Sequence, residues 1–125
     1  MAGEDFFTRQ LEGLIRVYAK LLFGKEYRPQ QQELVPTTPQ GEPVSLQDDL
    51  ERMLHQGELG EAEDLLFEVL ERAVAEGVGR WECQELVNWF YEQLSQMCDE
   101  ELEHGNFSRE EIIQGQAQAL FLCVQ

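Results

Sequence analysis

All four prolines of this chain lie within the stretch Pro29–Pro43. Proline removes a backbone hydrogen-bond donor and disfavours helix at the residue before it, so residues 24–44 read as a linker. Residues 45–125 contain no proline and repeat apolar residues at helical spacing. The pattern therefore predicts an all-α protein: an N-terminal helix over 1–23, a linker over 24–44 and a helical body over 45–125.

The N-terminal helix is expected over residues 5–23. One apolar row follows spacings of four and three and contains Phe7, Leu11, Leu14, Tyr18 and Leu21. The same face is widened by Phe6, Ile15, Val17, Leu22 and Phe23. A narrow polar stripe remains, with Arg9, Arg16 and Lys20. Such a helix has to be covered on more than one side.

The helical body is expected to form four helices, over 45–56, 60–75, 81–104 and 108–123. Ser45 and Ser108 each stand where a serine caps a helix N-terminus. Gly57 stands where a residue without Cβ ends a helix. These signals predict two antiparallel helical hairpins.

The turns of the two hairpins resemble each other at a constant offset of 48 residues. Gly57 then corresponds to Gly105, and Leu59 corresponds to Phe107. Repeated helical hairpins bury their apolar faces by stacking on one another, so we expect the two hairpins to be in contact.

The stretch 57–66, GELGEAEDLL, resembles the turn and second-helix start of a tetratricopeptide repeat. The glycine, the following leucine and Ala62 fit that pattern, whereas the first-helix Trp-Leu-Gly-Tyr signature and the closing proline do not appear. The resemblance implies tetratricopeptide-like packing of the helices. Peptide-binding residues of that family cannot be carried over to this chain.

The N-terminal helix gives a second resemblance. Residues 5–12, DFFTRQLE, and 19–25, AKLLFGK, are similar to the opening of a family of short bacterial proteins of unknown function. The match covers about 20 residues, and the acidic helical remainder agrees in character. This resemblance implies a helical fold and no particular activity.

The charge balance argues against nucleic acid as a partner. The chain has 25 acidic and 9 basic residues and a formal net charge of −16, which repels phosphate backbones. Five of the bases lie in residues 1–28, beside only four acids. We therefore expect the N-terminal helix to be attracted to the acidic body.

Cytoplasmic location is the expectation from several absences. The first residues are acidic and lack the positive end and apolar core of a signal peptide. No apolar run approaches the roughly 20 residues of a transmembrane segment. The three cysteines, Cys83, Cys98 and Cys123, are widely spaced, and we expect them to be reduced and buried.

No motif for catalysis, metal binding or cofactor binding stands out. Glu101 and His104 form one Glu-x-x-His, the spacing that di-iron bundles use twice, but no second copy surrounds His55. Cys98 and His104 are six residues apart and do not share a helix face. We therefore expect no catalytic residue, metal site or cofactor.

The function expected from these features is protein–protein interaction, through self-association or a partner peptide. The candidate interface residues are Phe6, Phe7, Leu14, Leu21, Leu22, Arg9, Arg16, Lys20, Trp89 and Tyr91. A homodimer with the N-terminal helix at its interface is the expected assembly, because the linker is long enough for that helix to reach a second copy. Two alternatives stay open: an enzyme whose active site is assembled from distant residues, and a membrane-surface or regulatory protein that acts through the basic stripe.

Overall fold

The computed structural model describes residues 12–23 and 45–124. Within these ranges the regular elements are all helices: α2 (Glu12–Phe23), α3 (Leu46–His55), α4 (Leu59–Glu76), α5 (Arg80–Ser95), α6 (Asp99–His104) and α7 (Arg109–Cys123). The all-α prediction is therefore confirmed. Residues 5–11 of the expected N-terminal helix and the whole expected linker, 24–44, lie outside the described residues.

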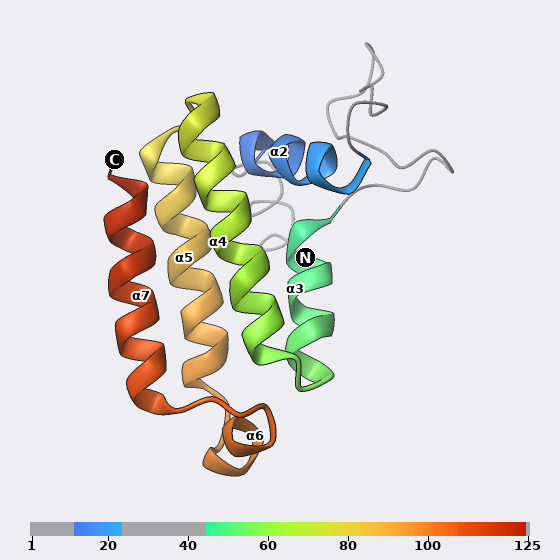
Figure 1. Cartoon of the computed structure of the whole chain (residues 1–125), viewed down its shortest axis with the longest axis vertical. Coiled ribbons are helices and arrows are strands. Elements are labelled where there is room, and N and C mark those ends of the chain that lie inside the picture. The colour runs from blue at the N-terminus through green and yellow to red at the C-terminus, as the bar shows by residue number, and fades with distance from the viewer. Residues whose placement is uncertain (1–11, 24–44, 125) are drawn as a thin grey trace, which may run out of the picture.

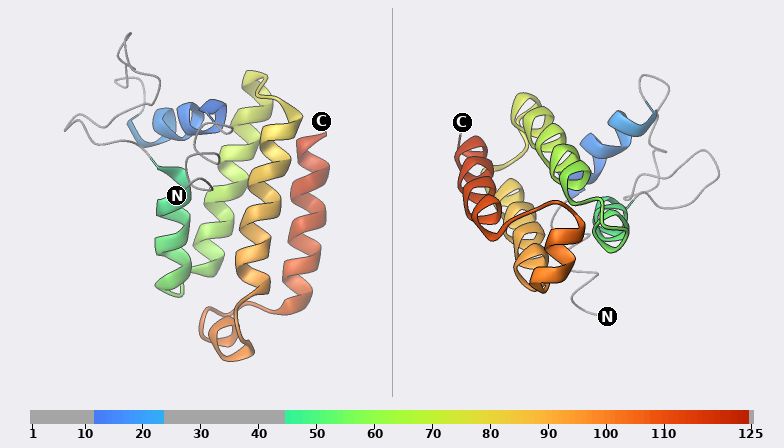
Figure 2. Two further views of the ribbon diagram at one scale, coloured as in Figure 1. Left: turned by 180° about the vertical axis from the view of Figure 1, so that it is seen from behind. Right: turned by 60° about the horizontal axis from the view of Figure 1, so that its bottom comes forward.

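The helices α3, α4, α5 and α7 run side by side along the long axis of the molecule (Figure 1). The helix α2 crosses one end of this group, and the short α6 lies at the other end. Seen from another direction, α4 lies between α7 on one side and α2 and α3 on the other (Figure 2). The arrangement makes α4 the central helix.

The sequence of α4 explains its central position. Its buried residues are Leu59, Ala62, Leu66, Val69, Leu70 and Ala73. They spread over a wide arc of the helix, which contacts α2, α3, α5 and α7. The two alanines allow neighbouring helices to approach closely, while burying each leucine contributes about 1.5–3 kcal/mol.

The turn between α3 and α4 has the hydrogen bonds of a Schellman motif. Gly57 adopts a left-handed conformation with φ of 80°. The Glu58 N–H donates to the Met53 carbonyl at 2.9 Å. This is the conformation for which glycine is favoured at a helix C-terminus, as the sequence predicts.

The turn between α6 and α7 departs from the expected repeat by one residue. Its left-handed residue is Asn106, with φ of 58°, whereas Gly105 has φ of −86°. The Phe107 N–H donates to the Leu102 carbonyl at 2.9 Å. Asparagine tolerates this conformation better than most residues do, so Asn106 takes the role of Gly57. The structural offset between the two turns is therefore 49 residues rather than 48.

Gly105 is needed for close packing instead. A Cβ atom at this position would lie 2.5 Å from Cδ1 of Leu59 and 3.1 Å from the Gly57 carbonyl oxygen. Leu59 is buried at the start of α4, so it has little room to move. The two similar turns are thus in direct contact, as stacking of the hairpins requires.

The prediction of a single helix over 81–104 is wrong, because α5 ends at Ser95 and α6 begins at Asp99. Cys98 has extended backbone angles, and its N–H donates to Oε1 of Glu101 at 3.0 Å. Asp99 and the next two residues, all acidic, favour a new helix N-terminus through the helix dipole. Cysteine is not a usual capping residue, so the sequence pattern did not reveal this start.

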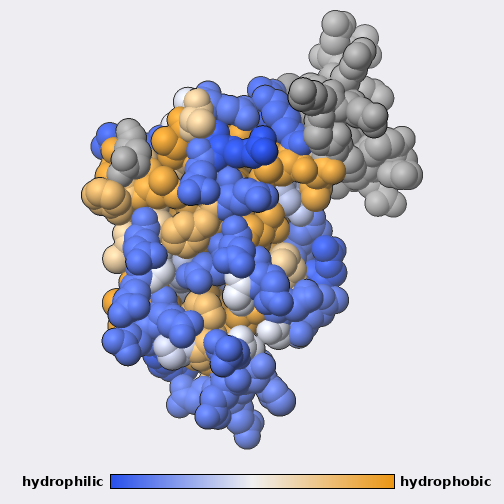
Figure 3. All heavy atoms as spheres, in the orientation of Figure 1, coloured by the Kyte–Doolittle hydropathy of each residue, from blue (hydrophilic) through white to orange (hydrophobic). Residues whose placement is uncertain are grey.

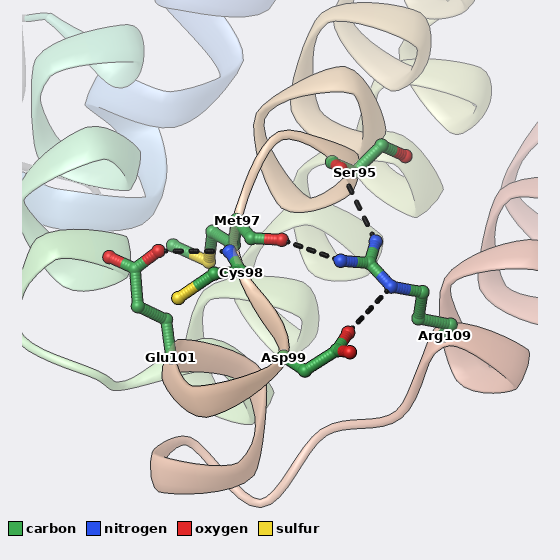
Figure 4. A network of polar contacts seen from close by, with 6 residues as sticks. All are labelled: Ser95, Met97, Cys98, Asp99, Glu101 and Arg109. Carbon is green, nitrogen blue, oxygen red and sulfur yellow. Dashed lines mark hydrogen bonds and ion pairs between the residues drawn. The ribbon is translucent and has the colours of Figure 1, made fainter.

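Arg109, the first residue of α7, stabilises the same corner (Figure 4). Its guanidinium donates to the carbonyl oxygens of Ser95 at 3.3 Å and Met97 at 2.7 Å. It also pairs with Asp99 at 3.0 Å. Carbonyl groups at a helix C-terminus have no partner within the helix, so one side chain of α7 satisfies the end of α5 and holds the start of α6.

We expect Gly105→Ala to destabilise the protein by about 1–3 kcal/mol, the usual cost of overpacking a well-packed core. The added methyl group would have to displace Leu59, which is buried. The free energy of unfolding, measured by urea titration, checks this.

Gly60→Ala is the matched control, because a Cβ at Gly60 meets nothing within 4 Å. Both substitutions reduce the freedom of the unfolded chain alike, and this one should leave stability unchanged or raise it by up to about 1 kcal/mol. Equal stability of the two variants would mean that the contact with Leu59 does not constrain the turn.

Candidate functional site

The apolar face of α2 is covered by the protein's own helices over the part that the structure describes. Leu14, Val17 and Tyr18 are buried, and α2 contacts α3, α4 and α5. Of the expected interface residues, Leu14 therefore belongs to the core, Leu21 is half-buried and Leu22 keeps 48% exposure. Phe6, Phe7 and Arg9 lie outside the described residues.

The polar side of α2 makes contacts with the acidic body. Lys20 Nζ lies 2.9 Å from Oε1 of Glu76 at the end of α4. The Tyr18 hydroxyl donates to Asp49 of α3, and this bond together with burial raises the pKa of Tyr18. Arg16 is exposed. The Lys20–Glu76 pair is exposed, so it contributes at most about 1 kcal/mol, and burial of the apolar face holds α2 in place.

Trp89 and Tyr91, the other two expected interface residues, also face inward to different degrees. Trp89 is half-buried and packs against the core. Tyr91 is 1% exposed, and its ring meets that of Phe90 edge-on, with 5.1 Å between the ring centres. Tyr91 is thus a core residue whose hydroxyl needs a partner.

That partner is Glu63 of α4, which joins three helices at one point. The Tyr91 hydroxyl donates to Oε2 of Glu63 at 2.6 Å. Gly115 of α7 lies directly against this bond, since a Cβ at Gly115 would collide with both side chains. Glycine therefore lets α7 pack over a polar contact between α4 and α5.

Burial raises the pKa of Glu63, and the negative charges of Asp64 and Glu111 raise it further, while the bond from Tyr91 acts in the opposite direction. Burial and the bond to Glu63 raise the pKa of Tyr91. The tyrosine thus keeps its proton and acts as donor. Structural burial accounts for these shifts, so they do not by themselves indicate an acid or base for catalysis.

A groove of about 620 Å³ lies at the end of the molecule where α3, α5 and α6 meet. Both histidines of the chain line it, His55 from the last turn of α3 and His104 from the last turn of α6. Glu101 lies there too, and its pKa is lowered mainly by the Cys98 N–H and also by the charge of His55. Among the described residues, no three His, Cys, Asp or Glu side chains lie close enough to hold a metal ion.

Sequence reasoning missed the meeting of the two histidines. With the offset of 48, His55 has no counterpart. When the turns are aligned on their left-handed residues, Gly57 and Asn106, His55 and His104 take the same position. Direct contact between the turns then brings both to one groove. The correct offset was the signal that could have found them.

The outer face of α7 is the most apolar exposed feature of a described helix. Ile113 is 71% exposed and Phe121 is 68% exposed, and Ala117 and Val124 are exposed on the same side. Figure 3 shows hydrophobic residues at the surface around the C-terminal end of this helix. The opposite side of α7 packs against α5 and α4, so α7 is apolar on both faces.

The cysteines divide between core and surface. Cys83 of α5 and Cys123 of α7 are buried and hydrogen-bonded to each other, and burial raises the pKa of Cys83 to about 12. Cys98 is exposed, contrary to the expectation that all three are buried. The contact between Cys83 and Cys123 shows that α5 and α7 are antiparallel neighbours.

Comparison with known proteins gives a family but no function. A family model described as a family of unknown function, DUF6483, matches residues 1–120. The chain therefore belongs to this family, in agreement with the resemblance seen at the N-terminal helix. No curated protein and no solved structure matches the chain. None of the described helices is long and apolar enough to cross a membrane.

We expect Glu63→Gln to stabilise the protein at neutral pH. A carboxyl group with a raised pKa favours folding fully below its ordinary pKa of 4.5, and this contribution is lost as pH rises through the raised value. Glutamine carries no charge, and its oxygen can still accept the Tyr91 hydroxyl. The advantage of the variant, measured as a difference in Tm, should therefore shrink as pH falls toward 4.5.

Glu68→Gln on the exposed side of α4 is the control for the loss of one negative charge. It should change Tm less than Glu63→Gln does. If the two variants behaved alike across the pH range, general charge repulsion rather than burial of Glu63 would explain the gain.

Proposed function

We propose that this protein is a non-catalytic interaction module that binds another protein through the outer face of α7. The observation that carries the proposal is the exposure of Ile113 and Phe121 on a helix whose other face is already buried in the fold. A helix that is apolar all round is usually covered on all sides. Contiguous exposed apolar surface of this kind marks sites of protein contact.

The charge pattern supports the same face. Residues 112–124 contain no Asp, Glu, Lys, Arg or His, in a chain with a net charge of −16. Charged residues are depleted at the centre of protein interfaces, while large apolar residues are enriched there. The outer face of α7 combines both properties.

The structure gives less support to an interface on α2. The residues of its apolar face that the structure describes are mostly buried by α3, α4 and α5, and Lys20 pairs with Glu76. The same pairing weakens the proposal of a membrane-surface role for the basic stripe. We therefore place the proposed interface on α7 rather than on α2.

The strongly shifted pKa values also fit a non-catalytic role. Tyr18, Tyr91 and Cys83 are all buried at helix contacts, and each bonds to a side chain of a neighbouring helix. Their shifts follow from core packing, and none of the three lines the groove at α3, α5 and α6. Groups of this kind hold helices together.

The test is photo-cross-linking in the native cell with a benzoylphenylalanine placed at Ile113. We expect a covalent adduct with protein. The same probe at Glu100, an exposed residue of the distant α6, is the control and should give little adduct. Equal cross-linking at both positions, or no protein adduct at position 113, would count against the proposed interface.

Ile113→Glu should abolish binding at this face without unfolding the protein. The side chain is 71% exposed, so its replacement should change the free energy of unfolding by no more than about 0.5 kcal/mol. Urea titration checks stability. A large loss of stability would show that Ile113 supports the fold rather than an interface.

A further inference from the structure

We infer that the protein bound by the outer face of α7 is a second copy of this chain, with its α7 antiparallel across a two-fold axis at Ala117. The inference rests on the proposed function and specifies the partner. It follows from three properties of the face: its spacing, its charge and its borders.

The spacing of the exposed residues is self-complementary. Ile113 and Phe121 lie four residues before and four residues after Ala117, so the three form one row along the helix. A two-fold axis at Ala117 would place Ile113 of each copy against Phe121 of the other. The small side chain at the centre would let the two helices approach closely. A symmetric dimer needs such a patch, which pairs with itself.

The charge of the chain limits where two copies can meet. Each copy carries −16, so contact between most pairs of surfaces brings like charges together. The outer face of α7 has no ionisable side chain from Ile112 to Val124 apart from the buried Cys123. Two copies can therefore associate there with less repulsion than at an acidic surface.

The borders of the face favour the antiparallel orientation over the parallel one. Glu110 and Glu111 lie at the N-terminal end of α7. Arg80 begins α5, and because α5 and α7 are antiparallel, it lies beside the C-terminal end of α7 (Figure 1). An antiparallel pair brings the two acids of one copy toward Arg80 of the other. A parallel pair would bring the acids of both copies together.

The size of the face sets the expected strength. From Ile113 to Val124 the helix rises about 16 Å, at 1.5 Å per residue. One helix face of this length is smaller than the roughly 800 Å² per partner of a stable interface, so the dimer should be weak and depend on concentration. Because each copy is acidic, added salt should strengthen it by screening the repulsion.

Sedimentation equilibrium of the full chain tests the partner. The mass should rise from 14.5 kDa toward twice that value as concentration increases to about 1 mM, a range suited to weak association. Raising the salt should shift the curve to lower concentration. Ile113→Glu should remain at 14.5 kDa throughout, while Glu100→Gln, on α6, should behave as the unchanged protein does.

Cysteine cross-linking tests the two-fold axis. In a Cys98→Ser background, Ala117→Cys places two thiols beside the axis, where a disulfide between copies can form with loss of two protons and two electrons to added oxidised glutathione. We expect a covalent dimer on a denaturing gel without reductant. Glu100→Cys in the same background is the control and should give several-fold less.

The outcomes separate this inference from the proposed function. If the mass stays at 14.5 kDa at every concentration while the probe at Ile113 captures a different protein, the inference is overturned and the interface stands. If a dimer forms but Ile113→Glu does not weaken it, the copies meet elsewhere and the inference is also overturned. No dimer and no adduct at Ile113 would overturn both.

Discussion

The packing of the described helices depends on the burial of α4. Leu66, Val69 and Leu70 have no exposed surface, and α2, α3, α5 and α7 all contact this helix. Burying so wide an arc requires neighbours on several sides, which explains why a short chain arranges its helices around one of them. α2 takes part in this cover, although it lies far from α4 in the sequence. Its position therefore follows from the apolar surface that α4 presents.

Polar contacts then specify how the surrounding helices are placed. Arg109 satisfies the end of α5 and holds α6, so the break between these helices is stabilised by a residue of α7. Tyr91 and Glu63 join α5 to α4 beneath Gly115 of α7. Apolar burial supplies most of the driving force for folding, whereas a buried hydroxyl that needs a partner restricts which arrangements are acceptable. The close contact of Gly105 with Leu59 adds a steric restriction of the same kind.

Periodicity in the sequence predicted the helical class and most of the helices, because it reports which side of a helix is apolar. It cannot report what covers that side. Leu14 was therefore expected at an interface between copies and lies in the core of one chain. The start of α6 was missed because Cys98 is an unusual capping residue, and the left-handed Asn106 was missed because Gly105 stands beside it. The groove that joins His55 and His104 depends on contact between two turns, which no local pattern encodes.

The two outermost described helices explain why the candidate interface differs from the one expected. α2 has one broad apolar side, which the body covers, and its Lys20 pairs with the body. α7 has apolar residues on both sides, but the body covers only the side of Ile112 and Ala119. A strong contrast between two helix faces makes α2 conspicuous in a sequence, whereas α7 has little contrast and attracts no attention. For a helix at the edge of a fold, that lack of contrast is itself informative, because one of its apolar faces stays at the surface unless a second molecule covers it.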